Sequence, residues 1–363
     1  LGDIIAYHNE TTVDWIGAFA QASYTAGPLS AYGMLGLSSI KYSYQDHFTV
    51  ANKKINSDAI SAMQFKGGAM FDVSSNISVF GNFGIVEKPP IMDNVIATDG
   101  TVADNPDNEE FVSTEAGVNY NTTDGKIAVK VNVYNTDWND RNLTKSVTSG
   151  QGSSGDTDII YLTGVDQNHK GIEIEVAAQV HEMVSVNAAI SIGDWSFVSD
   201  ANGDYEEYIE GTGFVTTAYE YALKDLYVGD MPQTSYVFGA TITPMPGLKV
   251  LGSMSMYSDN YADWSPGDRE IDSGGTADRD QVWKAPNYTK IDLHAYYDIP
   301  VELGNTKLQA FIHIFNALDE SYVQDALDNS QYNGWGGTSH DADNAEVFLG
   351  TPRYINAGIN VRF

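Results

Sequence analysis

The chain has 363 residues, with 49 Asp and Glu against 19 Lys and Arg, and its formal net charge is −30 at pH 7. This charge argues against binding nucleic acid through phosphate contacts, which need clustered cations. The sequence contains no Cys, which excludes disulfides and thiolate metal sites, and no apolar run approaches the about 18 residues that a membrane helix needs. The first residue is Leu1, with no Met and no signal segment before it, so we expect a preceding segment to have been removed.

Alternation of apolar and polar residues recurs along the whole chain, and this period of two predicts β-strands. Several of these stretches exceed the about 5–6 residues usual in soluble sheets and approach the about 9–11 residues of a membrane strand. Helical periodicity is almost absent. We predict about thirteen strands, near residues 15–27, 29–45, 61–74, 77–88, 111–122, 126–140, 168–180, 184–198, 235–245, 248–262, 287–300, 306–322 and 351–363.

The predicted connections alternate between very short and very long. The short ones are rich in the turn formers Gly, Pro, Asn and Asp, and they lie at 25–29, 74–76, 122–125, 181–184, 244–247 and 301–305. The long ones lie at 46–60, 89–110, 141–167, 199–234, 263–286 and 323–350. Tight turns at one end of antiparallel strands and long loops at the other are typical of outer-membrane barrels. The pattern therefore favours an all-β, antiparallel transmembrane barrel over a large soluble sandwich, whose strands also alternate.

Charged and aliphatic side chains separate onto opposite faces of these strands. Glu173 and Glu175, for example, alternate with Ile172, Ile174 and Val176. Charges on one face and aliphatic residues on the other suit a wet lumen inside a barrel and lipid outside it.

Five stretches, in chain order, resemble segments of the barrel of TonB-dependent outer-membrane receptors, the active transporters of Gram-negative bacteria. They are "VFGNFGIVEKPPIMDNV" (79–95), "NEEFVSTEAGVNY" (108–120), "VNVYNTDWNDRN" (131–142), "LQAFIHIFNALDESYV" (308–323) and "FLGTPRYINAGINVRF" (348–363). The fourth is similar to the family's "NLFDE.Y" element, and the fifth resembles its terminal "G.PR" strand. The resemblance implies that the terminal aromatic residue, Phe363, is a signal read by the barrel-assembly machinery.

Large transporters of this kind have 22-stranded barrels with a plugged lumen. Set against about thirteen predicted strands, the resemblance implies that residues 1–363 are the C-terminal portion of such a barrel, without the N-terminal plug and the first strands. A C-terminal fragment, a partly determined sequence and one piece of a split barrel all remain open.

The resemblance also implies a location in the outer membrane of a Gram-negative bacterium and the import of a scarce nutrient. Outside loops would capture the ligand, and the TonB complex, acting through the missing N-terminal part, would supply the energy. Outer-membrane lipid, the assembly machinery and a surface lipoprotein over the loops are the other expected partners. The alternative is a passive porin or adhesin-type barrel without a plug. No Ser-His-Asp order, HExxH motif or phosphate-binding Gly loop is present, so we expect no enzyme activity and no required cofactor.

Aromatic residues cluster in the long loops, where they are candidates for contacts with a ligand; loop packing and anchoring at the lipid headgroups are the alternatives. These candidates are Tyr205, Tyr208, Tyr219, Tyr221, Trp264, Trp283, Tyr332 and Trp335. Because the same loops are acidic, an anionic ferric siderophore is a poorer electrostatic fit than a glycan, peptide or other neutral ligand.

One acidic loop, 199–211, places oxygen-bearing side chains at alternate positions, which is the spacing of a calcium loop. The four residues are Asp200, Asn202, Asp204 and Glu206. The loop lacks the Gly and the final Glu of the calcium-binding template, so a solvated acidic loop is the alternative to a Ca²⁺ site. Bound Ca²⁺ would reverse the local charge. The seven His residues are scattered along the chain, and those within predicted strands are expected to form hydrogen bonds in the lumen rather than to bind metal.

Overall fold

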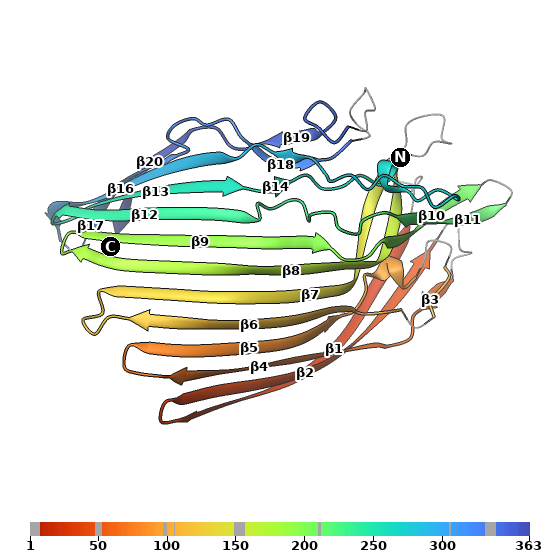
Figure 1. The fold of residues 1–363 in the computed structure, drawn as a ribbon, viewed down its shortest axis with the longest axis horizontal. Helices are drawn as coiled ribbons and strands as arrows, with labels where there is room; N and C mark the ends of the chain where they lie inside the picture. The colour runs from red at the N-terminus through yellow and green to blue at the C-terminus, as the bar shows by residue number, and fades with distance from the viewer. Residues whose placement is uncertain are drawn as a thin grey trace.

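The computed structural model describes residues 8–47, 53–96, 100–104, 106–148, 157–209, 212–304, 306–330 and 339–363. Its dominant feature is one antiparallel sheet of 16 strands, in which a main path of thirteen strands follows the chain order (Figure 1). These thirteen are β1 (Asn9–Ala26), β2 (Leu29–Asp46), β4 (Ile60–Asp72), β5 (Ile77–Lys88), β6 (Glu109–Asn121), β7 (Ile127–Thr148), β8 (Thr157–His181), β9 (Val184–Phe197), β12 (Thr234–Met245), β13 (Leu248–Ser258), β16 (Tyr288–Leu303), β17 (Thr306–Phe315) and β20 (Tyr354–Arg362). Each predicted strand coincides with one of them, so the predicted fold class is confirmed.

The remaining elements are short and lie beyond the main path. They are β3 (Lys54–Asn56), the hairpin β10 (Ala201–Ile209) and β11 (Gly213–Tyr221), the pair β14 (Asn260–Tyr261) and β15 (Lys284–Ala285), the pair β18 (Val323–Leu327) and β19 (Glu346–Leu349), and the short helices η1 (Met92–Asn94) and α1 (Pro266–Arg269). Among the described residues, no helix has the length and apolar character that crossing a membrane requires.

Most of the predicted long loops contain strand structure that was not predicted from the sequence, and this structure is longest in two of them. The region 141–167 was expected to be a loop, but β7 and β8 continue into it and stay paired as far as Thr148 and Thr157. The region 199–234 contains the β10–β11 hairpin, which also pairs with β8. Both regions contain Thr, Val, Ile and Tyr, which favour strands. Their pairing with one another at the loop end provides hydrogen-bond partners for their backbone groups.

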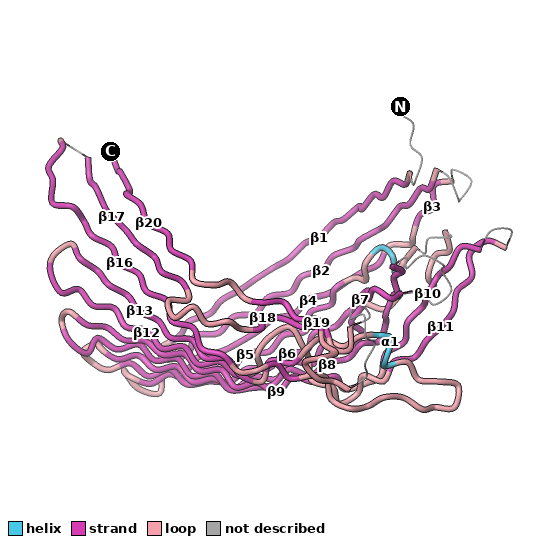
Figure 2. Tube along the Cα trace, turned by 90° about the horizontal axis from the view of Figure 1, so that it is seen from above, coloured by secondary structure: helices cyan, strands magenta, loops and turns pink. Residues whose placement is uncertain are grey.

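The sheet curves into an open trough, with β1 along one rim and β20 along the other (Figure 2). In the described part of the chain, β1 pairs only with β2, and β20 pairs only with β17. The tight turns and the C-terminus lie at one end of the strands, and the long connections lie at the other (Figure 1). At the turn end, Gly27 and Gly247 have φ values of 57° and 84°, a region in which glycine carries no steric penalty. We call the opposite end the loop end.

The register confirms the predicted separation of the two faces of the sheet. Glu173 of β8 lies opposite Asn132 of β7, and the two side chains are joined by a hydrogen bond of 2.9 Å. On the other face, Ile172 lies between Val133 and Ile192, and the latter two side chains are 52% and 45% exposed. Apolar side chains with this much exposure across a whole face suit lipid contact. We therefore call this the outer face and the polar one the inner face.

The largest apolar core lies at the loop end rather than between layers of sheet. Its buried members are Ile160, Leu162, Val165, Phe197, Ala201, Tyr221, Leu223, Leu226, Trp264 and Val282. They come from β8, β9, the β10–β11 hairpin and the connections after β11 and β13, so these segments pack against one another. The loop end is therefore a folded layer with its own core, and this layer can hold side chains in fixed positions.

Candidate functional site

A cavity of about 500 Å³ lies at the loop end, bounded by the extended part of β7 and by three long connections. Its volume falls in the range of small-molecule sites. It is lined by Arg141, Leu143, Thr144, Lys145, Gln167, Phe197, Val228, Gly229, Asp230, Asp263, Trp264, Ser265, Pro266, Leu327, Glu346 and Phe348. Two cations, three carboxylates and three aromatic rings are therefore gathered around one space.

Arg141 reaches the cavity because β7 changes register next to it. The pairing with β8 shifts after Trp138 and again at Arg141, and Asp140 between them adopts a left-handed φ of 53°. The backbone N–H of Asp140 donates to a carboxylate oxygen of Asp166 at 2.9 Å, which fixes the irregular segment. This bulge brings the Arg141 guanidinium to 4.3 Å from the centre of the Trp138 ring, the geometry of a cation–π contact.

The two cations of the cavity differ in their partners. Lys145 forms an ion pair with Asp263, donates to the carbonyl of Trp264 at 3.3 Å and lies 4.9 Å from the centre of that ring. In contrast, no acceptor among the described residues forms a hydrogen bond or ion pair with the guanidinium of Arg141. Its five N–H donors, set in a planar fork, are therefore free to bind an acceptor group of a ligand.

Asp230 gives the cavity a charge that depends on pH. It lies in the connection between β11 and β12 with a left-handed φ of 71°, and its N–H donates to the carbonyl of Tyr261 at 3.3 Å. Burial, followed by the neighbouring charges of Asp263 and Asp325, raises the pKa of Asp230 to about 7. Near neutral pH this carboxyl therefore changes between a neutral and a negative form.

A row of rings crosses the inner face next to Arg141. The ring centres of Phe111 and Trp138 are 4.6 Å apart, those of Trp138 and His169 are 6.5 Å apart, and those of His169 and Trp195 are 5.6 Å apart. Tyr134 accepts a hydrogen bond of 3.0 Å from the indole N–H of Trp195. This row was not predicted from the sequence, because its members lie on four strands and become neighbours only once the register is known. The row offers flat apolar surfaces beside a cation.

A buried network of charged side chains connects the loop at 263–286 to the loop at 323–350. Arg269 is 1% exposed, and its guanidinium donates to the carbonyl of Asp280 at 2.7 Å and to the carboxylate of Asp328 at 3.4 Å. His340 shares the Asp328 carboxylate and also contacts Asp278, with its ring nitrogens 2.6 Å from Asp328 and 2.9 Å from Asp278. Burial alone would lower the pKa of His340, but the hydrogen bonds to the two carboxylates outweigh burial and raise it. Arg269 and His340 therefore balance part of the negative charge of these acidic loops.

The predicted aromatic residues have different environments. Trp264 lines the cavity, although only 2% of it is exposed. Tyr221 is 2% exposed in the core, where burial raises the pKa of its phenol, and Tyr219 packs against the same core. Trp283 is half-buried and lies outside the cavity lining, and its backbone N–H donates to Asp328 at 3.2 Å. Of these four, only Trp264 lies where a ligand in the cavity could touch it.

The side chains of the other four aromatic candidates lie outside the described part of the structure. Tyr205 and Tyr208 lie in β10, but their side chains are not among those described, and Tyr332 and Trp335 lie outside the described residues. A role for these residues in ligand binding stays a prediction.

The residues predicted to bind calcium lie at the start of β10 and along it. Asn202, Asp204 and Glu206 follow one another along β10, where alternate residues stand about 6.6 Å apart. Asp200 is occupied by Arg279, at 2.8 and 3.1 Å, and by the backbone N–H groups of residues 223 and 224. The hydrogen bond to Arg279 is the main cause of its lowered pKa. Calcium binding by these four residues stays a prediction.

The motifs near the C-terminus connect β17 to β20. Asn316, 3% exposed with a φ of 46°, donates from its side chain to the carbonyls of Glu320 and Thr351, and its side-chain oxygen accepts from the N–H of Glu320. Asp319 accepts from the N–H of Arg353 at 2.8 Å. The "FNALDE" and "TPR" segments therefore form one junction. Phe363 follows β20 at the turn end and is 98% exposed.

Comparison with solved structures finds proteins of similar fold. The siderophore receptor PiuA from Acinetobacter baumannii matches 98% of this chain and 44% of its own length, at 12% identity and a TM-score of 0.63. The ferric citrate transporter FecA matches 99% of this chain and 47% of its own length, at 11% identity and a TM-score of 0.64. The copper transporter OprC matches 97% of this chain and 48% of its own length, at 16% identity and a TM-score of 0.63.

These likenesses establish the fold alone, and the chain spans slightly less than half the length of each of these proteins. A comparison with curated proteins finds no match. Among protein families, the one described as "TonB dependent receptor-like, beta-barrel" matches residues 2–317, which is most of the chain. The strand order, the two faces and this match agree with one another. The chain belongs to the family of TonB-dependent receptor-like β-barrels.

Proposed function

We propose that this curved sheet, which we call the wall, forms part of the β-barrel of an outer-membrane importer. With its long loops, it captures a small organic nutrient in the cavity at its loop end. Membership of the TonB-dependent receptor family supports import across the outer membrane of a Gram-negative bacterium. Proteins of similar fold include a siderophore receptor, a ferric citrate transporter and a copper transporter. The observation that carries the proposal is the Arg141 guanidinium, which is held on the ring of Trp138 at the cavity without an acceptor among the described residues.

The surroundings of Arg141 suggest the chemistry of the ligand. A planar guanidinium favours a carboxylate or another pair of oxygen acceptors, and such charge-assisted bonds are strong when partly desolvated. Trp138 and the row of rings beside it favour a flat, apolar part in the same ligand. The charge of Lys145 is already balanced by Asp263, so Arg141 would hold a single acceptor group. A ligand with one such group and an aromatic or apolar body fits better than a highly charged anion or a plain sugar.

We also infer from membership of the family that import is coupled to energy supplied by the TonB complex. A plug outside this chain would block the lumen until the TonB complex displaces it, and the ligand would then pass along the polar inner face. The wall itself would carry out no covalent chemistry. Phe363, at the last position of the chain, would be read by the assembly machinery.

The binding step can be tested with the full-length protein in detergent. The probes are ferric catecholate, ferric hydroxamate and ferric citrate complexes and a neutral oligosaccharide, followed by quenching of tryptophan fluorescence. A probe that binds the wild type should bind the Arg141→Ala variant about 10- to 150-fold more weakly, which corresponds to one lost charge-assisted hydrogen bond. Arg279→Ala is the matched control, because Arg279 is a loop arginine outside the cavity lining. Equal affinities for the two variants and the wild type would contradict the proposed site.

A further inference from the structure

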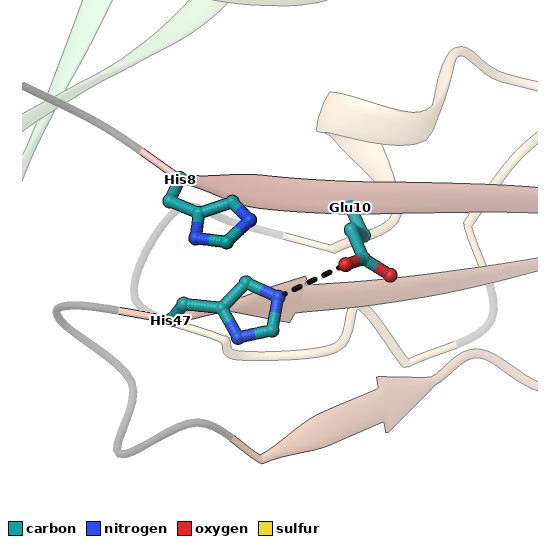
Figure 3. Close-up of side chains that lie close together, drawn as sticks. All are labelled: His8, Glu10 and His47. Atoms are coloured by element: carbon teal, nitrogen blue, oxygen red, sulfur yellow. Dashed lines mark hydrogen bonds and ion pairs between the residues drawn. The ribbon is translucent and has the colours of Figure 1, made fainter. Parts of the chain in front are cut away.

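Three side chains that can bind metal meet at the loop end of β1 and β2, away from the cavity. Figure 3 shows His8 and Glu10 at the start of β1 beside His47, which follows β2. The N–H of His47 donates to the carbonyl of His8 at 2.9 Å, and in the next pairs Asn9 lies opposite Asp46 and Glu10 opposite residue 45. His8 therefore lies directly opposite His47, and the period of two places Glu10 on the same face.

The donor atoms are already close together. The centres of the two imidazole rings are 4.1 Å apart with an angle of 31° between the ring planes, and His47 Nε2 is 3.2 Å from Glu10 Oε1. One donor atom from each residue lies within 4.8 Å of the other two. Zinc bonds of about 2.0–2.1 Å in a tetrahedron put neighbouring donor atoms about 3.4 Å apart. Small side-chain rotations would therefore bring the three groups around one ion.

The chemistry of the three side chains indicates which class of metal they could bind. An ion pair involving Glu10, whose side chain is 67% exposed, contributes little to stability. Two imidazoles and one carboxylate are instead the donor set that zinc and related transition metals prefer, whereas Ca²⁺ and Mg²⁺ require mainly oxygen ligands. The net charge of −30 also attracts dications.

We propose that His8, Glu10 and His47 bind one zinc-class dication that joins the loop-end tips of β1 and β2. Three protein ligands leave one coordination position for water or for a group from outside the chain. The face of β1 that carries His8 and Glu10 also carries Ile16 further along the strand and belongs to the outer face, whereas the Arg141 cavity lies on the inner side. The metal site is therefore independent of ligand capture.

The test is a titration of the full chain in detergent with Zn²⁺ by calorimetry and with Co²⁺ by visible absorption. We expect one strong site with the intense d–d bands of tetrahedral Co²⁺. His8→Ala, His47→Ala and Glu10→Gln should each weaken binding by at least about tenfold, since even changes to groups behind the ligands cost that much. His181→Ala is the matched control, because this histidine is exposed at the turn end.

Heat-modifiable migration in gels establishes that each variant is folded before its titration. The site is refuted if the three variants bind Zn²⁺ as tightly as the wild type, or if His181→Ala weakens binding equally. Displacement of Co²⁺ by a modest excess of Ca²⁺ would overturn the assigned class of metal. Loss of the site should leave binding at the Arg141 cavity unchanged, so failure of either proposal can be told from failure of the other.

Discussion

Removing the buried side chain of Arg269 should destabilise the packing of the long loops at the loop end. Arg269 and its partner Asp328 are both 1% exposed, and removing one member of a buried ion pair typically costs about 3–5 kcal/mol. In Arg269→Ala, the carbonyl of Asp280 would also lose its donor. His340 remains 2.6 Å from Asp328 and would compensate in part, so we expect the lower end of this range, about 3 kcal/mol.

A nearby arginine provides the matched control. Arg279 pairs with Asp200 at 2.8 Å, but its side chain is 50% exposed, and exposed pairs of this kind contribute about 0–1 kcal/mol. The assay is hydrogen–deuterium exchange of the backbone amides in residues 263–286. Arg269→Ala should speed exchange there by about 150-fold, since each 1.4 kcal/mol is a factor of ten, whereas Arg279→Ala should change it by less than about fivefold. Exchange in the two variants that agrees within about threefold would refute the argument that burial makes Arg269 the main connection between these loops.

Three further predictions concern the same end of the molecule. Because the pKa of His340 is raised in the folded loops, protonated His340 stabilises them fully below about pH 6.5, and this contribution is lost as pH rises through the raised value. Limited proteolysis of residues 263–286 should therefore quicken as pH rises above about 6.5 in the wild type, and less so in His340→Gln. The pKa of Asp230, about 7, should make binding of an anionic ferric siderophore weaken as pH rises through neutrality, and Asp230→Asn should remove that dependence in fluorescence titrations. Asn316→Ala should lower the stability of the β17–β20 junction by about 3 kcal/mol or more, because it removes three buried hydrogen bonds and places Ala in a left-handed backbone conformation. Asn316→Gly removes the same hydrogen bonds without the backbone strain, so comparing hydrogen exchange in the two variants separates the two effects.

The strands were predictable because each carries its own signal. A run such as residues 172–176 shows its period of two locally, and the turn glycines, including Gly247, mark where each hairpin reverses. The extended ends of β7 and β8 were missed because their polar, Thr-rich sequences resemble loops, and only their mutual pairing makes them strands. The local sequence pattern therefore predicted the thirteen strands of the main path, but not the extension of β7 and β8 at the loop end.

The site was less predictable, because its parts come together only through register and loop packing. Trp264 was identified from composition, but no sequence signal places Arg141 on Trp138, which depends on a bulge at Asp140. His8 and His47 are 39 positions apart in the sequence and become neighbours only when β1 and β2 pair. Interactions between distant positions such as these have no local period from which they could be read.

Import driven by TonB through this β-barrel can be tested by measuring uptake into cells. Cells that express the full-length protein would be given an isotope-labelled probe that binds the purified protein, and its accumulation would be compared in strains with and without functional TonB. We expect accumulation against the gradient that requires TonB and that falls at least about tenfold in the Arg141→Ala variant at limiting probe concentration. Entry at the same rate without TonB, and unaffected by Arg141→Ala, would contradict it and identify a passive channel instead.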